Sequence, residues 1–112
     1  MIFVTGPLFS GKREYLQNAL HLSPEEFVAR AVWDVERPAA GASSLEKLAE
    51  DLSAHEVVIA SEIGGGVVPA DPAERAAREA AGRLACLLAQ RADTVVRVVC
   101  GLPQVLKGEL LC

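Results

Sequence analysis

Aromatic residues and long apolar runs are both scarce in this sequence. Phe, Trp and Tyr make up 4% of the 112 residues, so small aliphatic side chains must supply most of the core. No apolar run approaches the roughly 20 residues that a membrane-spanning helix needs. The amino-terminal sequence MIFVTG is also too short and too uncharged for a signal peptide. These absences predict a cytoplasmic protein without a membrane segment.

An excess of positive charge is missing as well. The chain has 11 Lys and Arg against 15 Asp and Glu, for a formal net charge of −4, and its basic residues are scattered along the sequence. A protein that binds nucleic acid usually gathers Lys and Arg on one face to neutralise phosphates. The composition therefore predicts no nucleic-acid partner.

Cysteine and histidine are too few for a metal cluster. The three cysteines are an odd number and have no metal-type spacing. Cys86 and Cys100 stand among apolar residues, so we expect them to be reduced core residues, the alternative being reactive thiols. The two histidines, His21 and His55, stand alone in the sequence and are expected at the surface rather than in a metal site.

The residues that are present describe a small globular protein. Hydrophobic residues make up 51% of the chain and charged residues 23%, which is enough apolar surface for one modest core. At this length we expect a single domain over residues 1–112. Short apolar or β-branched runs predict buried strands at residues 2–5, 56–63 and 94–100.

Helical patterns alternate with these strands. Helices are predicted from Lys12, from the Ser23-Pro24 start, over residues 45–52, and from the Asp71-Pro72 start to about Arg91. Three segments are less regular. Residues 32–35 fit a strand or a helix end, residues 37–44 are predicted as a loop, and residues 101–112 have no assignment.

A glycine-bounded segment directly follows the first predicted strand. Residues 6–12 read Gly6-Pro7-Leu8-Phe9-Ser10-Gly11-Lys12, which fits the G-x-x-x-x-G-K pattern of a phosphate-binding loop (P-loop). In such a loop the backbone amides and the positive end of the next helix face the phosphates, and the lysine reaches the outer ones. We expect this loop to bind ATP or GTP, with Lys12 as a catalytic residue. The alternative is a tight strand-to-helix turn with an incidental lysine.

The residue after the loop departs from the usual pattern. Ser or Thr normally follows the lysine, and its hydroxyl holds Mg²⁺. This chain has Arg13, which we expect to lie in the nucleotide site but which cannot ligate a metal. A Mg²⁺ cofactor must then be held by other groups or be held weakly.

An acidic residue and three glycines follow the second predicted strand. Glu62 stands at the carboxyl end of that strand, where ligands collect in parallel sheets. There it is expected to act as a catalytic residue and as a Mg²⁺ ligand, facing the loop. The alternative is a solvated acid in a flexible connector. On the next helix, Arg75, Arg78 and Arg83 either contact phosphate or form a solvated face.

The order of these elements predicts an α/β fold, a shortened P-loop-type parallel sheet with flanking helices. Several segments of the second half carry a more specific pattern. They read Glu62-Ile63-Gly64-x-Gly66-Val67-Val68-Pro69, Arg75-x-x-Arg78-Glu79-x-x-Gly82-Arg83-Leu84, Ala92-Asp93-x-Val95, and Gly101-Leu102-Pro103 with Lys107. Together with residues 1–12, they resemble the adenosylcobinamide kinase and adenosylcobinamide-phosphate guanylyltransferase family.

The resemblance implies a function in cobalamin biosynthesis. It implies a kinase that phosphorylates the aminopropanol hydroxyl of a corrinoid substrate, a second step that transfers GMP through a histidine, and a homo-oligomer with sites between subunits. The segment that carries the nucleotide-accepting histidine in the family is missing from this shorter chain. We therefore expect guanylyl transfer to be absent or to follow another route. The alternative function is a non-catalytic nucleotide- or corrinoid-binding subunit, which Arg13 favours.

Overall fold

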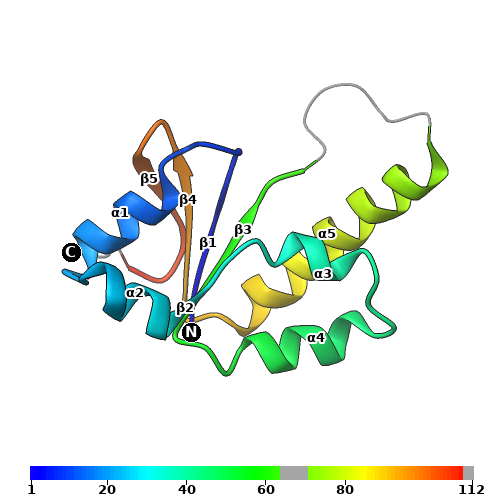
Figure 1. The fold of residues 1–112 in the computed structure, drawn as a ribbon, viewed down its shortest axis with the longest axis horizontal. Helices are drawn as coiled ribbons and strands as arrows, with labels where there is room; N and C mark the ends of the chain where they lie inside the picture. The colour runs from blue at the N-terminus through cyan, green and yellow to red at the C-terminus, as the bar shows by residue number, and fades with distance from the viewer. Residues whose placement is uncertain (64–70, 110–112) are drawn as a thin grey trace.

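One five-stranded sheet with helices on both faces makes up the structure, a computed structural model that describes residues 1–63 and 71–109 (Figure 1). The strand order is β2-β3-β1-β4-β5. β1, β2, β3 and β4 run parallel, and β5 pairs antiparallel with β4 at the edge. The strands are β1 Ile2–Gly6, β2 Ala31–Val32, β3 Val57–Ser61, β4 Thr94–Val99 and β5 Leu102–Lys107.

The helices connect these strands in the expected alternating order. They are α1 Lys12–Ala19, α2 Pro24–Arg30, α3 Glu36–Ala39, α4 Leu45–Leu52 and α5 Pro72–Arg91. The predicted helix starts are confirmed. Ser23 accepts a hydrogen bond from the Glu26 amide in a complete capping box, and Asp71 accepts one from the Ala73 amide at 3.0 Å.

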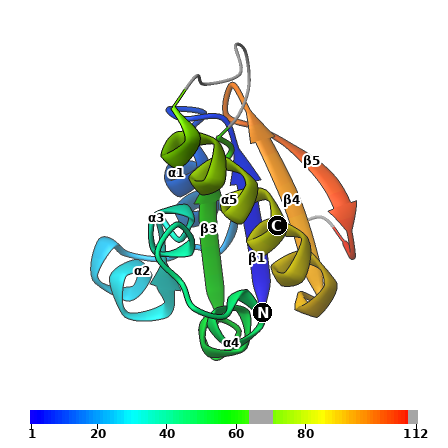
Figure 2. The ribbon, with the colours of Figure 1, turned by 90° about the vertical axis from the view of Figure 1, so that its right-hand side faces the viewer.

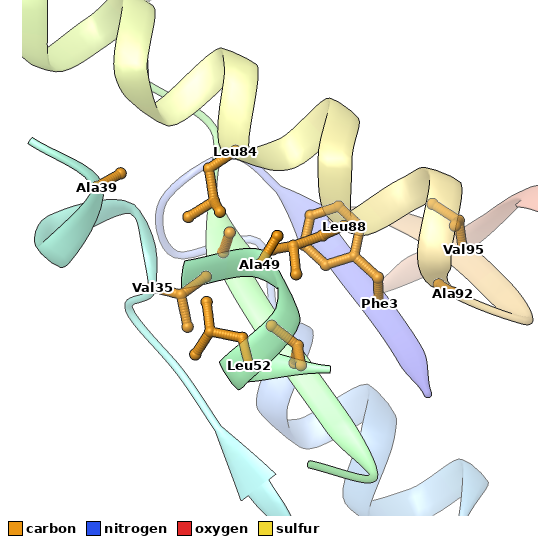
Figure 3. Packing of buried hydrophobic residues seen from close by; sticks show 11 residues of the cluster. Phe3, Val35, Ala39, Ala49, Leu52, Leu84, Leu88, Ala92 and Val95 are labelled. Carbon is orange, nitrogen blue, oxygen red and sulfur yellow. The ribbon is translucent and has the colours of Figure 1, made fainter. Parts of the chain in front are cut away.

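Two hydrophobic clusters lie on opposite faces of the sheet, because successive strand residues point to opposite sides. Phe3 and Val58 face the side covered by α3, α4 and α5, where they pack with Leu84 and Leu88 (Figure 3). Their neighbours along the strands belong to the other cluster, with Leu16 of α1 and Phe27 of α2. Figure 2 shows the helices on the two sides of the sheet. Each face is therefore closed by its own set of helices.

Three local predictions were wrong or incomplete. Residues 37–44 were expected as a loop, but α3 begins at Glu36 and its Ala39 is buried against α5. Residues 32–35, which fitted a strand or a helix end, hold only the end of β2 at Val32, and the φ of 58° at Asp34 lies outside the β region. The unassigned tail supplies β5, so the sheet is parallel in all strands but one.

Both described cysteines lie at the surface, which corrects the prediction that they belong to the core. Cys86 is exposed on α5 because it falls between Leu84 and Leu88, the residues that face the sheet. Cys100 is exposed in the turn between β4 and β5, where it and Gly101 have φ values of 53° and 74°. Two successive residues with positive φ are typical of a tight hairpin turn. Cys112 and the glycines at 64–66 lie outside the described residues.

In the part of the chain that the structure describes, no helix is long and apolar enough to cross a membrane.

Candidate functional site

The segment between β1 and α1 is a strained loop at the carboxyl ends of the parallel strands. Gly6 has a φ of 151°, and a Cβ atom there would lie 2.2 Å from the Val98 carbonyl oxygen. Phe9 and Gly11 have φ values of 59° and 86°. The glycines thus permit a path that residues with side chains rarely adopt. The predicted position of this loop between a strand and a helix is confirmed.

Lys12 folds back into this loop. Its Nζ donates to the Pro7 carbonyl oxygen at 2.7 Å and more weakly to the Gly6 carbonyl oxygen at 3.3 Å. The residue is 7% exposed, and Ser10 Oγ lies 3.4 Å from Nζ. Burial lowers the pKa of Lys12, while nearby carboxylates oppose this effect. A positive charge is therefore held among neutral oxygens at the centre of the loop.

The first turn of α1 has no residue, among those described, that caps its backbone amides. Its N-cap residue is Gly11, and no side chain among the described residues caps its amides. The α2, α4 and α5 helices are each capped by an oxygen of Ser23, Ser44 or Asp71. Uncapped amides and the positive end of a helix dipole both favour an anion at this place.

Two further hydrogen bonds hold the loop against neighbouring strands. The Glu62 amide donates to the Gly6 carbonyl oxygen at 2.8 Å, and the Gly101 amide donates to the Ser10 carbonyl oxygen at 2.7 Å. Gly11 also lies close to Gly101, since a Cβ atom on Gly11 would be 3.3 Å from the Gly101 Cα. The end of β3 and the β4–β5 turn therefore both brace the loop.

A cavity of about 480 Å³ opens beside the loop. It is lined by the loop and the start of α1 on one side and by residues that follow β2 and end β3 on the other. The lining residues are Leu8, Phe9, Ser10, Gly11, Lys12, Arg13, Glu14, Trp33, Asp34, Ile59 and Ser61. Most of the residues predicted to contact a nucleotide line this cavity.

Arg13 lies against two aromatic rings. Its guanidinium carbon is 4.6 Å from the centroid of the Trp33 ring and 5.7 Å from that of Phe27. The two rings are stacked, with centroids 5.9 Å apart and an angle of 22° between their planes. Phe27 is buried beneath, so the rings form a fixed platform for the cation. Sequence reasoning missed this platform, although Trp33 is the one Trp of the chain.

Glu62 is paired with an arginine that sequence reasoning also missed. Arg97 Nε donates to Glu62 Oε1 at 2.5 Å, and its Nη2 donates to Oε2 at 3.0 Å. The hydrogen bonds from Arg97 lower the pKa of Glu62, and the same bonds raise the pKa of Arg97. Arg97 is the one charged residue of β4, and its place in an otherwise β-branched run was the available indication.

Acidic side chains gather at the same edge. Asp34 lines the cavity, and Glu36 accepts a hydrogen bond from the Ser61 amide at 3.0 Å. Asp34, Glu36 and Glu62 all act electrostatically on Lys12. Even so, no group of three or more His, Cys, Asp or Glu residues within residues 1–63 and 71–109 is arranged to hold a metal ion.

Other predicted residues lie away from this cavity. Arg83 lines a separate cavity of about 420 Å³ between α5 and the segment from α3 to α4. His55 lies two residues before β3, and His21 follows α1; neither lines the cavity beside the loop. The roles of Lys12, Glu62 and residues 6–13 in catalysis and binding stay predictions.

Comparison with known proteins gives one family. The model of the cobinamide kinase / cobinamide phosphate guanyltransferase family matches residues 15–106. This range contains α2, β3, α5, β4 and all of β5 except Lys107, while the loop at residues 6–12 precedes it. A search of curated proteins found no match.

Proposed function

The chain belongs to the cobinamide kinase / cobinamide phosphate guanyltransferase family, and we propose that it binds the phosphates of ATP or GTP in a P-loop at residues 6–12. The observation that carries this proposal is the buried Lys12, which donates to loop carbonyl oxygens in front of the uncapped start of α1. The acceptor is a corrinoid alcohol, in keeping with the family's place in cobalamin biosynthesis.

Phosphate oxygens are better partners for Lys12 than its present ones. Its Nζ now donates to the neutral carbonyl oxygens of Pro7 and Gly6. Hydrogen bonds between a charged donor and a charged acceptor are roughly twice as strong as neutral ones. A bound triphosphate would therefore draw Lys12 outward, while the amides of the first α1 turn donate to the same group.

Phosphoryl transfer then requires an acceptor hydroxyl in line with the outer phosphate. The hydroxyl oxygen attacks the terminal phosphorus, the bond to the nucleoside diphosphate breaks so that the diphosphate leaves, and the hydroxyl proton passes to solvent water. In this proposal Lys12 offsets the charge on the transferred group, and Glu62 orients the hydroxyl. The paired Arg97 keeps Glu62 ionised at neutral pH and fixes its orientation.

Lys12→Ala tests the phosphate site. We expect nucleotide binding to weaken by about 1.5–3 kcal/mol, which is roughly 10- to 150-fold, because a hydrogen-bonded cation is removed. Isothermal titration calorimetry with ATP and with GTP measures this change. Lys47→Ala is the matched control, since Lys47 is an exposed lysine on α4 paired with Asp51. Equal affinities for the wild type and Lys12→Ala would remove the P-loop from the proposal.

A second candidate function is a binding subunit without turnover. Arg13 supports it, since the hydroxyl that normally follows the P-loop lysine is replaced. Incubation with a corrinoid alcohol and radiolabelled nucleotide decides between the two. Label transferred to the corrinoid establishes the kinase, whereas nucleotide binding without transfer establishes the binding subunit.

The guanylyl-transfer step of the family is not expected in this chain. That step needs a nucleophile that carries a covalent nucleotide near the phosphates. His55 precedes β3 at the amino ends of the strands, and His21 follows the far end of α1. Labelled GTP should therefore leave no acid-labile nucleotide on the protein. A stoichiometric phosphoramidate on either histidine would establish the second activity.

We also propose that the chain forms a homo-oligomer. All six residues of β5 are exposed, and they include Leu102 and Leu106 at 70% and 56% exposure. An exposed edge strand with apolar side chains is a surface that a second copy can cover. Light scattering at micromolar concentration measures the mass, and a strictly monomeric value would contradict this expectation.

A further inference from the structure

We infer that Arg13, held on the rings of Trp33 and Phe27, supplies the second positive charge of the phosphate site, so that a polyphosphate binds there without a divalent metal ion. This inference rests on the proposed phosphate site and deepens it. It concerns the one position where the loop departs from the G-x-x-x-x-G-K-[ST] pattern.

The position of Arg13 is fixed by packing rather than by an ion pair. The guanidinium lies over the Trp33 ring at 4.6 Å, and Phe27, which is 1% exposed, supports it from the core. No carboxylate among the described residues forms a salt bridge with Arg13. A stacked guanidinium keeps its N–H groups at the ring edge for other partners, and its fork matches phosphate oxygens.

The cavity brings this cation to the place where the phosphates are expected. Arg13 and Trp33 line the same cavity as Lys12 and Ser10. Arg13 is also the second residue of α1, whose first amides are uncapped. Two adjacent cations and a helix start therefore converge on one space, where the cations offset the nearby charges of Asp34 and Glu36. The charge of Glu62 is already offset by Arg97.

The oxygen groups around the loop do not match the usual ligands of Mg²⁺ in a P-loop site. The hydroxyl ligand is absent at position 13, and Glu62 has both of its oxygens engaged by Arg97. Glu36 Oε1 accepts from the Ser61 amide. Asp34 and Glu14 are the two carboxylates of the cavity lining that could approach a metal beside the phosphates. Mg²⁺ in phosphate sites relies on one or two carboxylates plus the hydroxyl of this loop.

The primary experiment compares binding with and without the metal. The wild-type chain is titrated calorimetrically with ATP and with inorganic tripolyphosphate, in excess EDTA and again in MgCl₂. We expect the dissociation constants in the two conditions to agree within about threefold, since the protein itself supplies the compensating charge. Trp33 fluorescence should change on binding, because its ring contacts Arg13.

Variants of Arg13 separate its charge from the missing hydroxyl. Arg13→Ala should weaken tripolyphosphate binding about tenfold in both conditions. Arg13→Ser restores the usual hydroxyl, so it should weaken binding about tenfold in EDTA and recover part of the loss in MgCl₂. Arg91→Ala removes the same charge from the exposed end of α5 near the start of β4 and should leave both constants unchanged.

A platform variant tests the stacking itself. Trp33→Leu keeps an apolar side chain and removes the ring, and we expect it to weaken binding less than Arg13→Ala, by about threefold. Circular dichroism of each variant establishes that the fold is retained. A loss of binding that exceeds that of Arg13→Ala would show that Trp33 acts on the ligand independently of Arg13.

Three outcomes overturn the inference, and they can be told apart. If the wild type binds in MgCl₂ but not in EDTA, and Asp34→Asn abolishes that dependence, a metal is held after all, while the phosphate site itself stands. If neither ligand binds in either condition, the proposed phosphate site fails together with the inference. An affinity of Arg13→Ala equal to that of the wild type also overturns the role of Arg13.

Discussion

The two consecutive helices α1 and α2 begin in opposite ways. At the start of α2, the side chains of Ser23 and Glu26 each accept a hydrogen bond from the other residue's backbone amide, and Pro24 occupies the first turn. At the start of α1, a glycine with a φ of 86° stands in the N-cap position, and no side chain among the described residues replaces it. The first arrangement stabilises the helix by itself, whereas the second leaves donors that a ligand can use.

The residues at the start of α2 stabilise the fold. The residues at the start of α1 adopt backbone conformations or burial that their residue types disfavour. Gly6, Phe9 and Gly11 all have positive φ, and Lys12 is a buried cation. Such features persist only where the surrounding structure compensates for them, and they gather at functional sites. Substitutions at the two helix starts should therefore act on different measured quantities.

The largest expected effect is that of Gly6→Ala. A Cβ atom would lie 2.2 Å from the Val98 carbonyl oxygen, which belongs to the backbone of β4 and cannot rotate away. We expect the free energy of unfolding in urea to fall by about 3 kcal/mol or more. Gly82→Ala is the control, because no atom lies within 4 Å of a Cβ there. As a helical position, Gly82 should gain about 0.5–1 kcal/mol with Ala. A small loss for Gly6→Ala would show that the loop tolerates other paths.

Glu62→Gln should act on turnover rather than on binding. The substitution keeps the shape and removes the charge that orients the acceptor, so we expect a loss on the order of a hundredfold, or about 2.7 kcal/mol of barrier. Affinity for the nucleotide in EDTA should change little. Glu50→Gln, an exposed acid of α4, provides the control in the same transfer assay. Full activity of Glu62→Gln would leave Glu62 as a partner of Arg97 alone.

Ser23→Ala tests the capped helix start. Loss of the hydrogen bond to the Glu26 amide should lower the free energy of unfolding by about 1 kcal/mol. Nucleotide affinity should be the same as in the wild type, since the cap does not line the cavity. Ser43→Ala, which precedes the α4 cap by one residue, should change neither quantity. Weaker nucleotide binding by Ser23→Ala would mean that the two helix starts are coupled.

The smallest expected effect is the pH dependence of the pair between Glu62 and Arg97. The folded state lowers the pKa of Glu62, so the pair stabilises the fold above the ordinary pKa of 4.5 and loses this contribution as the pH falls below it. The side chains are 35% and 37% exposed, so solvent screening keeps the contribution below about 1 kcal/mol. The difference in unfolding free energy between the wild type and Glu62→Gln should therefore shrink between pH 7 and pH 3. A constant difference would contradict the pairing.

The features predicted correctly are those that local sequence determines. The order of strand, loop and helix at residues 2–19, the capping box at Ser23 and the start of α5 after Asp71 each depend on residues a few positions apart. Both β3 and β4 were predicted because a β-branched run is a local pattern. The alternation of these elements then predicts the parallel part of the sheet.

The features that were missed depend on contacts between distant parts of the chain. The pair of Glu62 and Arg97 joins residues 35 positions apart, and Arg13 meets Trp33 because α1 packs in the same hydrophobic cluster as the residues at the end of β2. The exposure of Cys86 was missed because apolar neighbours in sequence point to different sides of a helix. α3 was missed because Pro, Gly and Ser around it are typical of loops.

The hydrogen bond from the Gly101 amide to the Ser10 carbonyl oxygen has a consequence for the rate of binding. Together with the bond from the Glu62 amide to Gly6, it holds the loop in one path from two sides. Ordering a loop residue costs about 1–2 kcal/mol of conformational entropy. Here the loop is already ordered when the protein folds, so ligand association does not have to order it. The loop then need not rearrange after encounter, so association should show a single phase whose rate rises linearly with ligand concentration.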